Sequence, residues 1–197
     1  MSNRTHGAIA LSLLCLAFNA SADLADMPSG AYSVDPNHGY ITYTYSHQGF
    51  SFPTISFRSF EVDLNLDPEN PENSTLAVLI DATSIDSQVD VFNGHLNGPN
   101  FFDTKNHPTI TFTSTSIEST GENTFDIHGE LTIKGHTNPV TLAATINKAG
   151  HHPRRNTPIV GVSATAKVSR SEWGLDRAIP LVGDEITISI SAELNHD

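Results

Sequence analysis

Residues 101–112 read FFDTKNHPTITF, and this stretch contains the two signals from which the fold can be predicted. After its proline, threonine alternates with Ile110 and Phe112, which predicts a strand with one apolar face. Phe101 and Phe102 are adjacent instead, and adjacent residues on a strand point to opposite faces. We therefore expect these two phenylalanines to lie in a non-strand segment that lays both rings against the mouth of a hollow interior.

The same period of two recurs along most of the chain. Apolar residues, many of them β-branched, occupy every second position in the runs 41–46, 60–66, 109–113, 124–134, 140–147, 160–168 and 185–194. Turn-forming residues separate these runs, as in TGEN at 120–123 and NP at 138–139. Short strands joined by such turns predict one all-β domain, an antiparallel sandwich or barrel. The alternation stops at 89–102 and 170–183, where we expect one or two short helices or a lid.

Small residues favour a barrel with a cavity over a packed sandwich. They occupy inferred inward positions in several strands: Ala82, Ser114, Gly129, Ala144, Ala164, Ala166 and Ala192. A barrel of about eight strands is either just filled by its side chains or able to hold one small ligand. The small residues favour the second case, and the alternative is that facing aromatic rings fill the gaps.

The N-terminal residues predict export. Arg4 precedes an apolar run at 8–18, and small residues then form an A-x-A arrangement that ends at Ala22. This pattern predicts a signal peptide over residues 1–22 and a mature domain over residues 23–197. The run is too short for a membrane-spanning helix, which needs about 20 residues. Because Cys15 leaves with the signal peptide, the mature chain is expected to contain no disulfide and no thiolate site.

Composition and motifs exclude several classes of function. The formal charge of −12 argues against nucleic acids and anionic membrane surfaces as partners. The chain lacks the G-x-S-x-G, H-E-x-x-H and glycine-rich phosphate-loop motifs, so we expect no enzyme and no catalytic residues. Nine histidines remain after residue 22, but none has the H-x-H or H-x₃-H spacing that preorganises a metal site, so we expect no metal.

Motifs in the mature chain resemble those of the YceI-like family. They are YSVDPNH at 32–38, HQGF at 47–50, HL at 95–96 with FFD at 101–103, PTITF at 108–112, GELTIKG at 129–135 with TNPV at 137–140, and RSEWGL at 170–175 with VGDEI at 182–186. The resemblance covers about residues 31–194. Two positions depart from the family pattern: Asn93-Gly94 stands where the family has an Arg-Asp pair, and Ser59-Phe60 occupies a region where it has a glycine.

The resemblance implies a fold, a ligand and a compartment. The fold would be a single antiparallel lipocalin-like β-barrel of about eight strands, and the ligand a long-chain isoprenoid, either a polyprenyl lipid or an isoprenoid quinone. No other cofactor is implied. The protein would carry or store this lipid in the periplasm, as a monomer or a homodimer.

Apolar and aromatic residues of these strands and interruptions are the expected ligand contacts. They are Phe50, Phe52, Phe57, Phe60, Phe92, Leu96, Phe101, Phe102, Ile110, Phe112, Leu131 and Trp173. Ligand sites share such an apolar lining with few polar groups. For any single ring, ordinary core packing is the alternative. Arg170 either caps the barrel by hydrogen bonds, which we favour, or meets a polar head group.

The sequence is also compatible with two other functions. The protein could be a stress-linked accessory protein whose barrel is packed solid and whose surface binds a protein partner. It could also act as an enzyme on the bound tail, but no general base can be assigned from the sequence.

Overall fold

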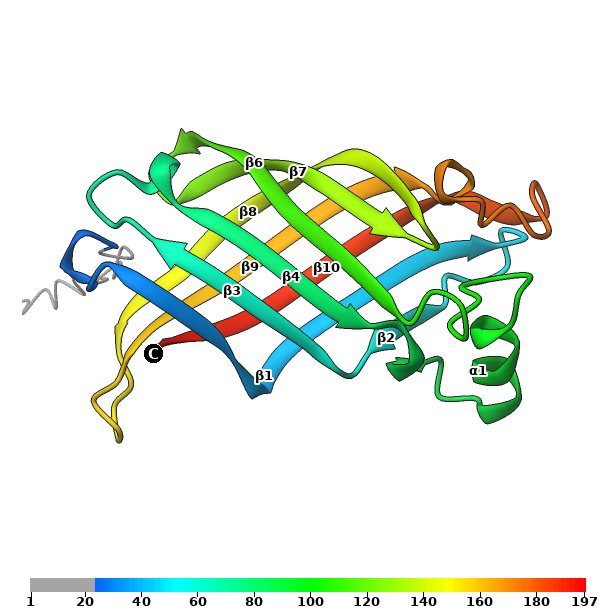
Figure 1. Ribbon diagram of the computed structural model, residues 1–197, viewed down its shortest axis with the longest axis horizontal. Helices are drawn as coiled ribbons and strands as arrows, with labels where there is room; N and C mark the ends of the chain where they lie inside the picture. Colours follow the sequence, from blue (N-terminus) through cyan, green and yellow to red (C-terminus); the bar gives the residue numbers. More distant parts are fainter. Residues whose placement is uncertain (1–23) are drawn as a thin grey trace, which may run out of the picture.

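The computed structural model describes residues 24–197, which form one sheet of ten antiparallel strands (Figure 1). The expected signal peptide lies outside the described residues. The strands are β1 (Gly30–His47), β2 (Thr54–Phe57), β3 (Phe60–Leu66), β4 (Thr75–Asp81), β5 (Ile85–Asp86), β6 (Thr109–Gly121), β7 (Thr124–Ile133), β8 (His136–His151), β9 (Pro158–Ser169) and β10 (Val182–His196). One α-helix, α1 (Asp90–Asn97), and four 3-10 turns, η1 (Leu24–Asp26), η2 (Pro71–Asn73), η3 (Ala82–Ser84) and η4 (Arg170–Trp173), complete the described chain.

The sheet closes on itself because the first and last long strands pair. Its strand order is β10-β9-β8-β7-β6-β4-β3-β1-β2-β5, and β1 also pairs with β10 along most of its length. β1 changes its other partner midway, from β3 at residues 30–33 to β2 at residues 41–44. β2 and β5 thus extend one end of the wall, and the other eight strands close the barrel. The expected antiparallel barrel of about eight strands is confirmed.

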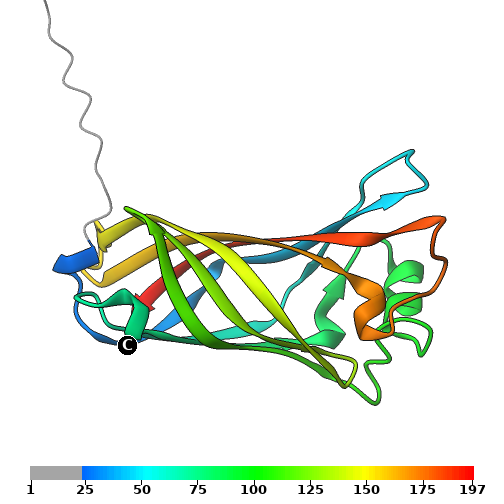
Figure 2. The same ribbon diagram turned by 90° about the horizontal axis from the view of Figure 1, so that it is seen from above.

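Both interruptions of the alternation lie at the same end of the barrel. α1 forms in the first and η4 in the second, as Figures 1 and 2 show at the end where the β1–β2 hairpin also projects. Within residues 24–197, no helix has both the length and the apolar character needed to span a bilayer.

The period of two places one apolar face of each strand inside the barrel. Across β9 and β10, for example, Ala164 opposes Ile190 and Val160 opposes Leu194. The side chains divide into two clusters along the barrel. One lies near α1 and includes Trp173, and the other lies at the opposite end, where Leu24 and Met27 cover it.

Gly129 lies where an aromatic ring fills the interior. A Cβ atom at this position would lie 2.4 Å from Cζ of Phe112 and 2.5 Å from the backbone oxygen of Thr113. Real Cβ atoms do not approach heavy atoms so closely, so Phe112 can occupy its position only because residue 129 has no side chain. The small inward residues were expected either to leave a cavity or to be filled by facing aromatic rings. At Gly129 the second possibility is correct.

A bulge in β1 places a carboxylate on the outside of the barrel. Val34 pairs with Leu194 and Gly39 with Ala192, so residues 35–38 oppose the single residue Glu193. Pro36, which has no N–H to donate to a ladder, lies in this unpaired segment.

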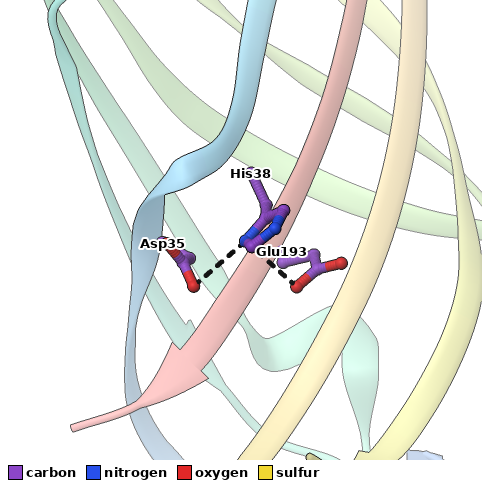
Figure 3. Close-up of side chains that lie close together, drawn as sticks. All are labelled: Asp35, His38 and Glu193. Atoms are coloured by element: carbon purple, nitrogen blue, oxygen red, sulfur yellow. Dashed lines mark ion pairs between the residues drawn. The ribbon is translucent and has the colours of Figure 1, made fainter.

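The side chain of Asp35 satisfies the polar groups of this bulge. It accepts hydrogen bonds from the backbone N–H of Asn37 at 2.9 Å and from Nη2 of Arg155 at 3.4 Å. Nδ1 of His38 lies 3.3 Å from Asp35 and 3.7 Å from Glu193 (Figure 3). The carboxylate therefore ties β1 to the β8–β9 hairpin that carries Arg155.

The contact between Gly129 and Phe112 can be tested by adding one methyl group. We expect Gly129→Ala to lower the free energy of unfolding by about 1–3 kcal/mol, because the new methyl group must displace the Phe112 ring or the β6 backbone. The measurement is urea unfolding followed by circular dichroism. Gly94→Ala on α1 is the matched control, since nothing lies within 4 Å of a Cβ there and alanine favours a helix. Equal stability of Gly129→Ala and the wild type would contradict this packing.

The bulge predicts an acid-dependent contribution to stability. The hydrogen bond from Asn37, with smaller contributions from His38 and Arg155, lowers the pKa of Asp35 from 3.8 to about 2. A carboxyl group with a lowered folded-state pKa stabilises the fold above its unfolded pKa, and this contribution is lost as the pH falls through the folded value. Asp35→Asn should therefore be less stable than the wild type at neutral pH, and the difference should shrink between about pH 5 and pH 2.

Urea unfolding of both proteins across this pH range measures the difference. Asp63→Asn, which removes an exposed carboxylate from β3, controls for the loss of one negative charge. A difference between wild type and Asp35→Asn that stays constant with pH would show that the carboxylate does not stabilise the bulge.

Candidate functional site

The barrel contains a cavity of about 240 Å³ at the end that carries α1. Side chains of most barrel strands, together with α1 and the segment after η4, form its wall. The wall is mainly aliphatic and aromatic, because the inward positions of the alternating strands point into it. Its polar lining residues are Thr42, Tyr43, Tyr45, His47, Arg170 and Arg177.

A second cavity of about 130 Å³ lies in the other half of the barrel. Its polar lining residues are Ser74 and Thr145, and the other lining residues, such as Leu66 and Val160, are apolar. Four residues line both cavities and so form a waist between them: Ile41, Val78, Leu142 and Ile190. The two cavities therefore lie in line inside the barrel, with one apolar constriction between them.

Most of the expected ligand contacts lie in these walls. The larger cavity is lined by Phe57, Phe92, Leu96, Phe101, Phe102, Ile110, Phe112, Leu131 and Trp173. Phe60 lines the smaller cavity, so the aromatic that replaces the family's glycine region does face the lumen.

Phe50 and Phe52 are the exceptions, and their assignment to the lining is corrected here. They line neither cavity, and 87% and 68% of their surfaces are exposed. Both lie in the turn between β1 and β2, and this hairpin extends past the end of the barrel (Figure 2).

The adjacent phenylalanines at 101–102 do lie together at the barrel end. The chain turns after α1, where the N–H of Phe102 donates to the backbone oxygen of Leu96 at 3.0 Å. Asp103 has a φ of 49° and its backbone oxygen accepts from the N–H groups of Asn106 and His107, which closes a tight turn. Because the segment is a turn and not a strand, Phe101 and Phe102 both reach the cavity wall.

Phe102 is the centre of an aromatic group in this wall. Its ring meets Phe57 edge-on, with centroids 5.7 Å apart, and lies 6.3 Å from the ring of Tyr43. Edge-to-face pairs of this kind are favourable beyond the apolar area that they bury. The group joins the turn before β6 to β1 and β2.

Tyr43 and Tyr45 are lining residues that the sequence analysis did not assign to the site. The alternation of residues 41–46 already placed them on the same face as Ile41, and this was the signal that could have identified them. Burial raises the pKa of Tyr43 and of Tyr45 above the ordinary value of 10, while the charge of Arg170 partly opposes this. Both hydroxyl groups are therefore protonated at neutral pH and can donate a hydrogen bond to a polar group in the cavity.

Arg170 holds the segment that covers this end of the barrel. Its Nε donates to the backbone oxygen of Gly183 at 2.9 Å, and Nη2 donates to those of Arg177 and Val182, each at 3.0 Å. Nη1 donates to the backbone oxygen of Leu175. Burial lowers the pKa of Arg170, and these carbonyl groups and the nearby Asp184 compensate for the buried charge. The contacts agree with the capping role that the sequence analysis favoured.

Trp173 anchors the same segment to β7. Its side chain is fully buried, and its Nε1 donates to the backbone oxygen of Leu131 on β7 at 2.9 Å. Gly174 follows with a φ of 67°, the left-handed conformation that ends η4. Together, Arg170 and Trp173 hold the Arg170–Gly183 segment against the barrel.

The cluster of Asp35, His38 and Glu193 is separate from the cavities and lies on the outside of the barrel (Figure 3). Its ligand atoms lie within 4.8 Å of one another, which is close enough for a metal ion. However, the guanidinium of Arg155 already lies on the same Asp35 oxygen that faces His38. We assign this cluster to the bulge of β1 and not to metal binding.

Comparison with known proteins agrees with this architecture. The model of the YceI-like domain matches residues 32–194. A UPF0312 protein of Ectopseudomonas mendocina is 36% identical over 164 residues, which are 82% of this chain and 85% of that protein.

Solved structures show the same fold. The crystal structure of Burkholderia cenocepacia BcnA superposes with a TM-score of 0.74 at 24% identity, over 83% of this chain and 99% of that one. A polyisoprenoid binding domain from Saccharophagus degradans, implicated in plant cell wall breakdown, superposes with a TM-score of 0.66 at 14% identity, over 84% and 98% of the two chains. The closed barrel, the two interruptions at one of its ends and the match over residues 32–194 lead to one conclusion: this chain belongs to the YceI-like family.

Proposed function

We propose that the protein binds one long isoprenoid lipid inside the barrel and carries or stores it in the periplasm. The observation that carries this proposal is the pair of apolar cavities in line, about 240 and 130 Å³, that meet at the waist of Ile41, Val78, Leu142 and Ile190. An elongated hydrocarbon chain fits such a shape better than a compact ligand does. Burial of apolar surface contributes about 25 cal/mol per Å², so the tail needs no charged contact.

The distribution of polar groups supports one orientation of the ligand. The smaller cavity has only Ser74 and Thr145 as polar lining residues, which suits the end of a hydrocarbon tail. The larger cavity has the hydroxyl groups of Tyr43 and Tyr45 beside the charge of Arg170. A head group with oxygen acceptors, such as a quinone, would therefore lie in the larger cavity.

A protein of the same fold supports the isoprenoid nature of the tail, and the N-terminal sequence supports the compartment. The Saccharophagus degradans domain with the same fold is described as polyisoprenoid binding. The pattern at residues 1–22 supports export to the periplasm. A barrel that acts only through its surface would have no need of two cavities, so the alternative of a solidly packed accessory protein finds no support in the interior.

Native mass spectrometry of the protein purified from its own host tests the proposal. We expect a mass increment that disappears after extraction with organic solvent, and a prenyl lipid or prenyl quinone in the extract. An empty barrel that also fails to bind added prenyl lipids would overturn the proposal.

The waist allows a sharper test of how the ligand lies. Val78 faces the waist, and its neighbour Leu79 is 42% exposed on the outer face of β4. We expect Val78→Phe to weaken binding of a long-tailed prenyl quinone at least about tenfold, because each buried CH₂ contributes about 0.8 kcal/mol and the tail can no longer enter the smaller cavity. Binding of a short-tailed analogue should change little.

Ligand titration followed by tryptophan fluorescence measures both affinities. Leu79→Phe is the matched control, because it adds the same ring one residue away but outside the barrel. If Val78→Phe weakens short and long tails equally, the ligand does not extend through the waist.

A further inference from the structure

Large exposed apolar side chains gather at the cavity end of the molecule. Within residues 24–197, seven such residues stand out, and five of them lie in the hairpin, α1 and loop segments at this end: Phe50, Phe52, Val89, Val91 and Leu181. The other two, Tyr40 and Leu79, lie on the barrel wall. Exposed apolar residues scattered singly need no explanation, but a group at one functional end does.

Three of these residues lie on two loops that contact each other. Phe50 and Phe52 are in the β1–β2 hairpin, and Leu181, 67% exposed, directly precedes β10. The N–H of Gln48 donates to the backbone oxygen of Leu181 at 3.1 Å, so the two loops are held side by side (Figure 2). We call Phe50, Phe52 and Leu181 the apolar tip.

The apolar tip adjoins the opening of the larger cavity. His47, Arg177 and Ala178 are exposed residues, yet they also line this cavity, so the cavity reaches the surface between the hairpin and the Arg170–Gly183 segment. His47 pairs with Val182, next to Leu181. A ligand that enters here passes the apolar tip.

The charge near the apolar tip differs from that of the whole protein. The chain carries 22 acidic and 10 basic residues, but residues 36–60 and 177–183, which carry the apolar tip, contain no aspartate or glutamate. Their charged residues are Arg58, which pairs with Asp86, and Arg177 at the cavity wall. These two segments therefore add no negative charge of their own beside the apolar tip, and the acidic residues Asp176 and Asp184 flank the second of them.

We propose that the apolar tip docks the cavity opening onto a lipid bilayer. Phenylalanine and leucine side chains are those that anchor proteins in the interfacial region of a membrane. A water-insoluble molecule could then move between the bilayer and the cavity without crossing water. A second copy of this chain is a weaker candidate, because the apolar tip buries too little surface. Each aromatic side chain buries about 150–250 Å², whereas a stable interface buries ~800 Å² on each partner.

Sedimentation with lipid vesicles tests the docking surface directly. The probe is ligand-free vesicles of phosphatidylethanolamine and phosphatidylglycerol, with the full mature protein at low and at high salt. We expect the wild type to bind under both conditions, because apolar insertion is not screened by salt. The triple variant Phe50→Ser, Phe52→Ser, Leu181→Ser should show a partition coefficient at least about tenfold lower, since burial of even one such side chain contributes about that factor.

Tyr40→Ser and Leu79→Ser are the matched controls, because each removes an exposed apolar side chain from the barrel wall and should leave vesicle binding unchanged. Wild-type protein that does not bind vesicles would overturn the proposal, and so would a triple variant that binds as well as the wild type. Light scattering identifies a third outcome against it: a wild-type dimer that the triple variant converts to a monomer, with no vesicle binding by either.

A second measurement separates docking from ligand binding in the lumen. The apolar tip lines neither cavity, so the triple variant should bind a prenyl quinone supplied in detergent with wild-type affinity, and circular dichroism should show an intact fold. Its uptake of the same quinone from vesicles should be at least about tenfold slower. Failure of all variants to bind the quinone would count against the proposed ligand, whereas vesicle docking would still be decided by sedimentation alone.

Discussion

The pairing of β1 with β10 is the constraint on which the rest of the structure depends. It joins the two ends of the sheet, so the described strands form a barrel and the alternating apolar residues acquire a common interior. The cysteine at position 15 is the chain's only one, so no disulfide can reinforce the barrel. Stability must therefore come from the closed ladder and from the apolar clusters inside it.

Closure alone does not decide whether the interior is solid or hollow. Where Gly129 faces Phe112, the wall is packed without space, yet two cavities remain on either side of the waist. The end near the larger cavity is covered by α1 and by turns, and not by strands. Because turns have no ladder of their own, hydrogen bonds from Arg170 and Trp173 hold the Arg170–Gly183 part of this cover in place.

The two ends of the barrel differ in polarity and in how far exposed residues contribute to the cavity wall. At one end, η1 places Leu24 over the smaller cavity, and the nearby side chains are almost entirely apolar. At the other end, polar groups line the cavity, exposed residues reach its wall, and the β1–β2 hairpin projects beyond the barrel. Such an arrangement is the basis of the orientation proposed above, with the polar head group of an amphipathic ligand in the larger cavity.

Much of this molecule could be predicted from local sequence. The period of two determined the strands and their inward faces, and the turn at 101–107 determined that both Phe101 and Phe102 could reach the barrel end. Ordered motifs indicated the family. These features follow from the chemistry of neighbouring residues, which needs no knowledge of distant contacts.

Other features were decided only by tertiary structure. Phe50 and Phe52 alternate with a serine, as lining residues of the strands alternate with polar residues. However, the hairpin extends past the end of the barrel and leaves both side chains exposed to solvent. The waist and the fit of Phe112 against Gly129 depend on which residues of separate strands face one another. Register and closure set these contacts across the barrel, and no local pattern encodes them.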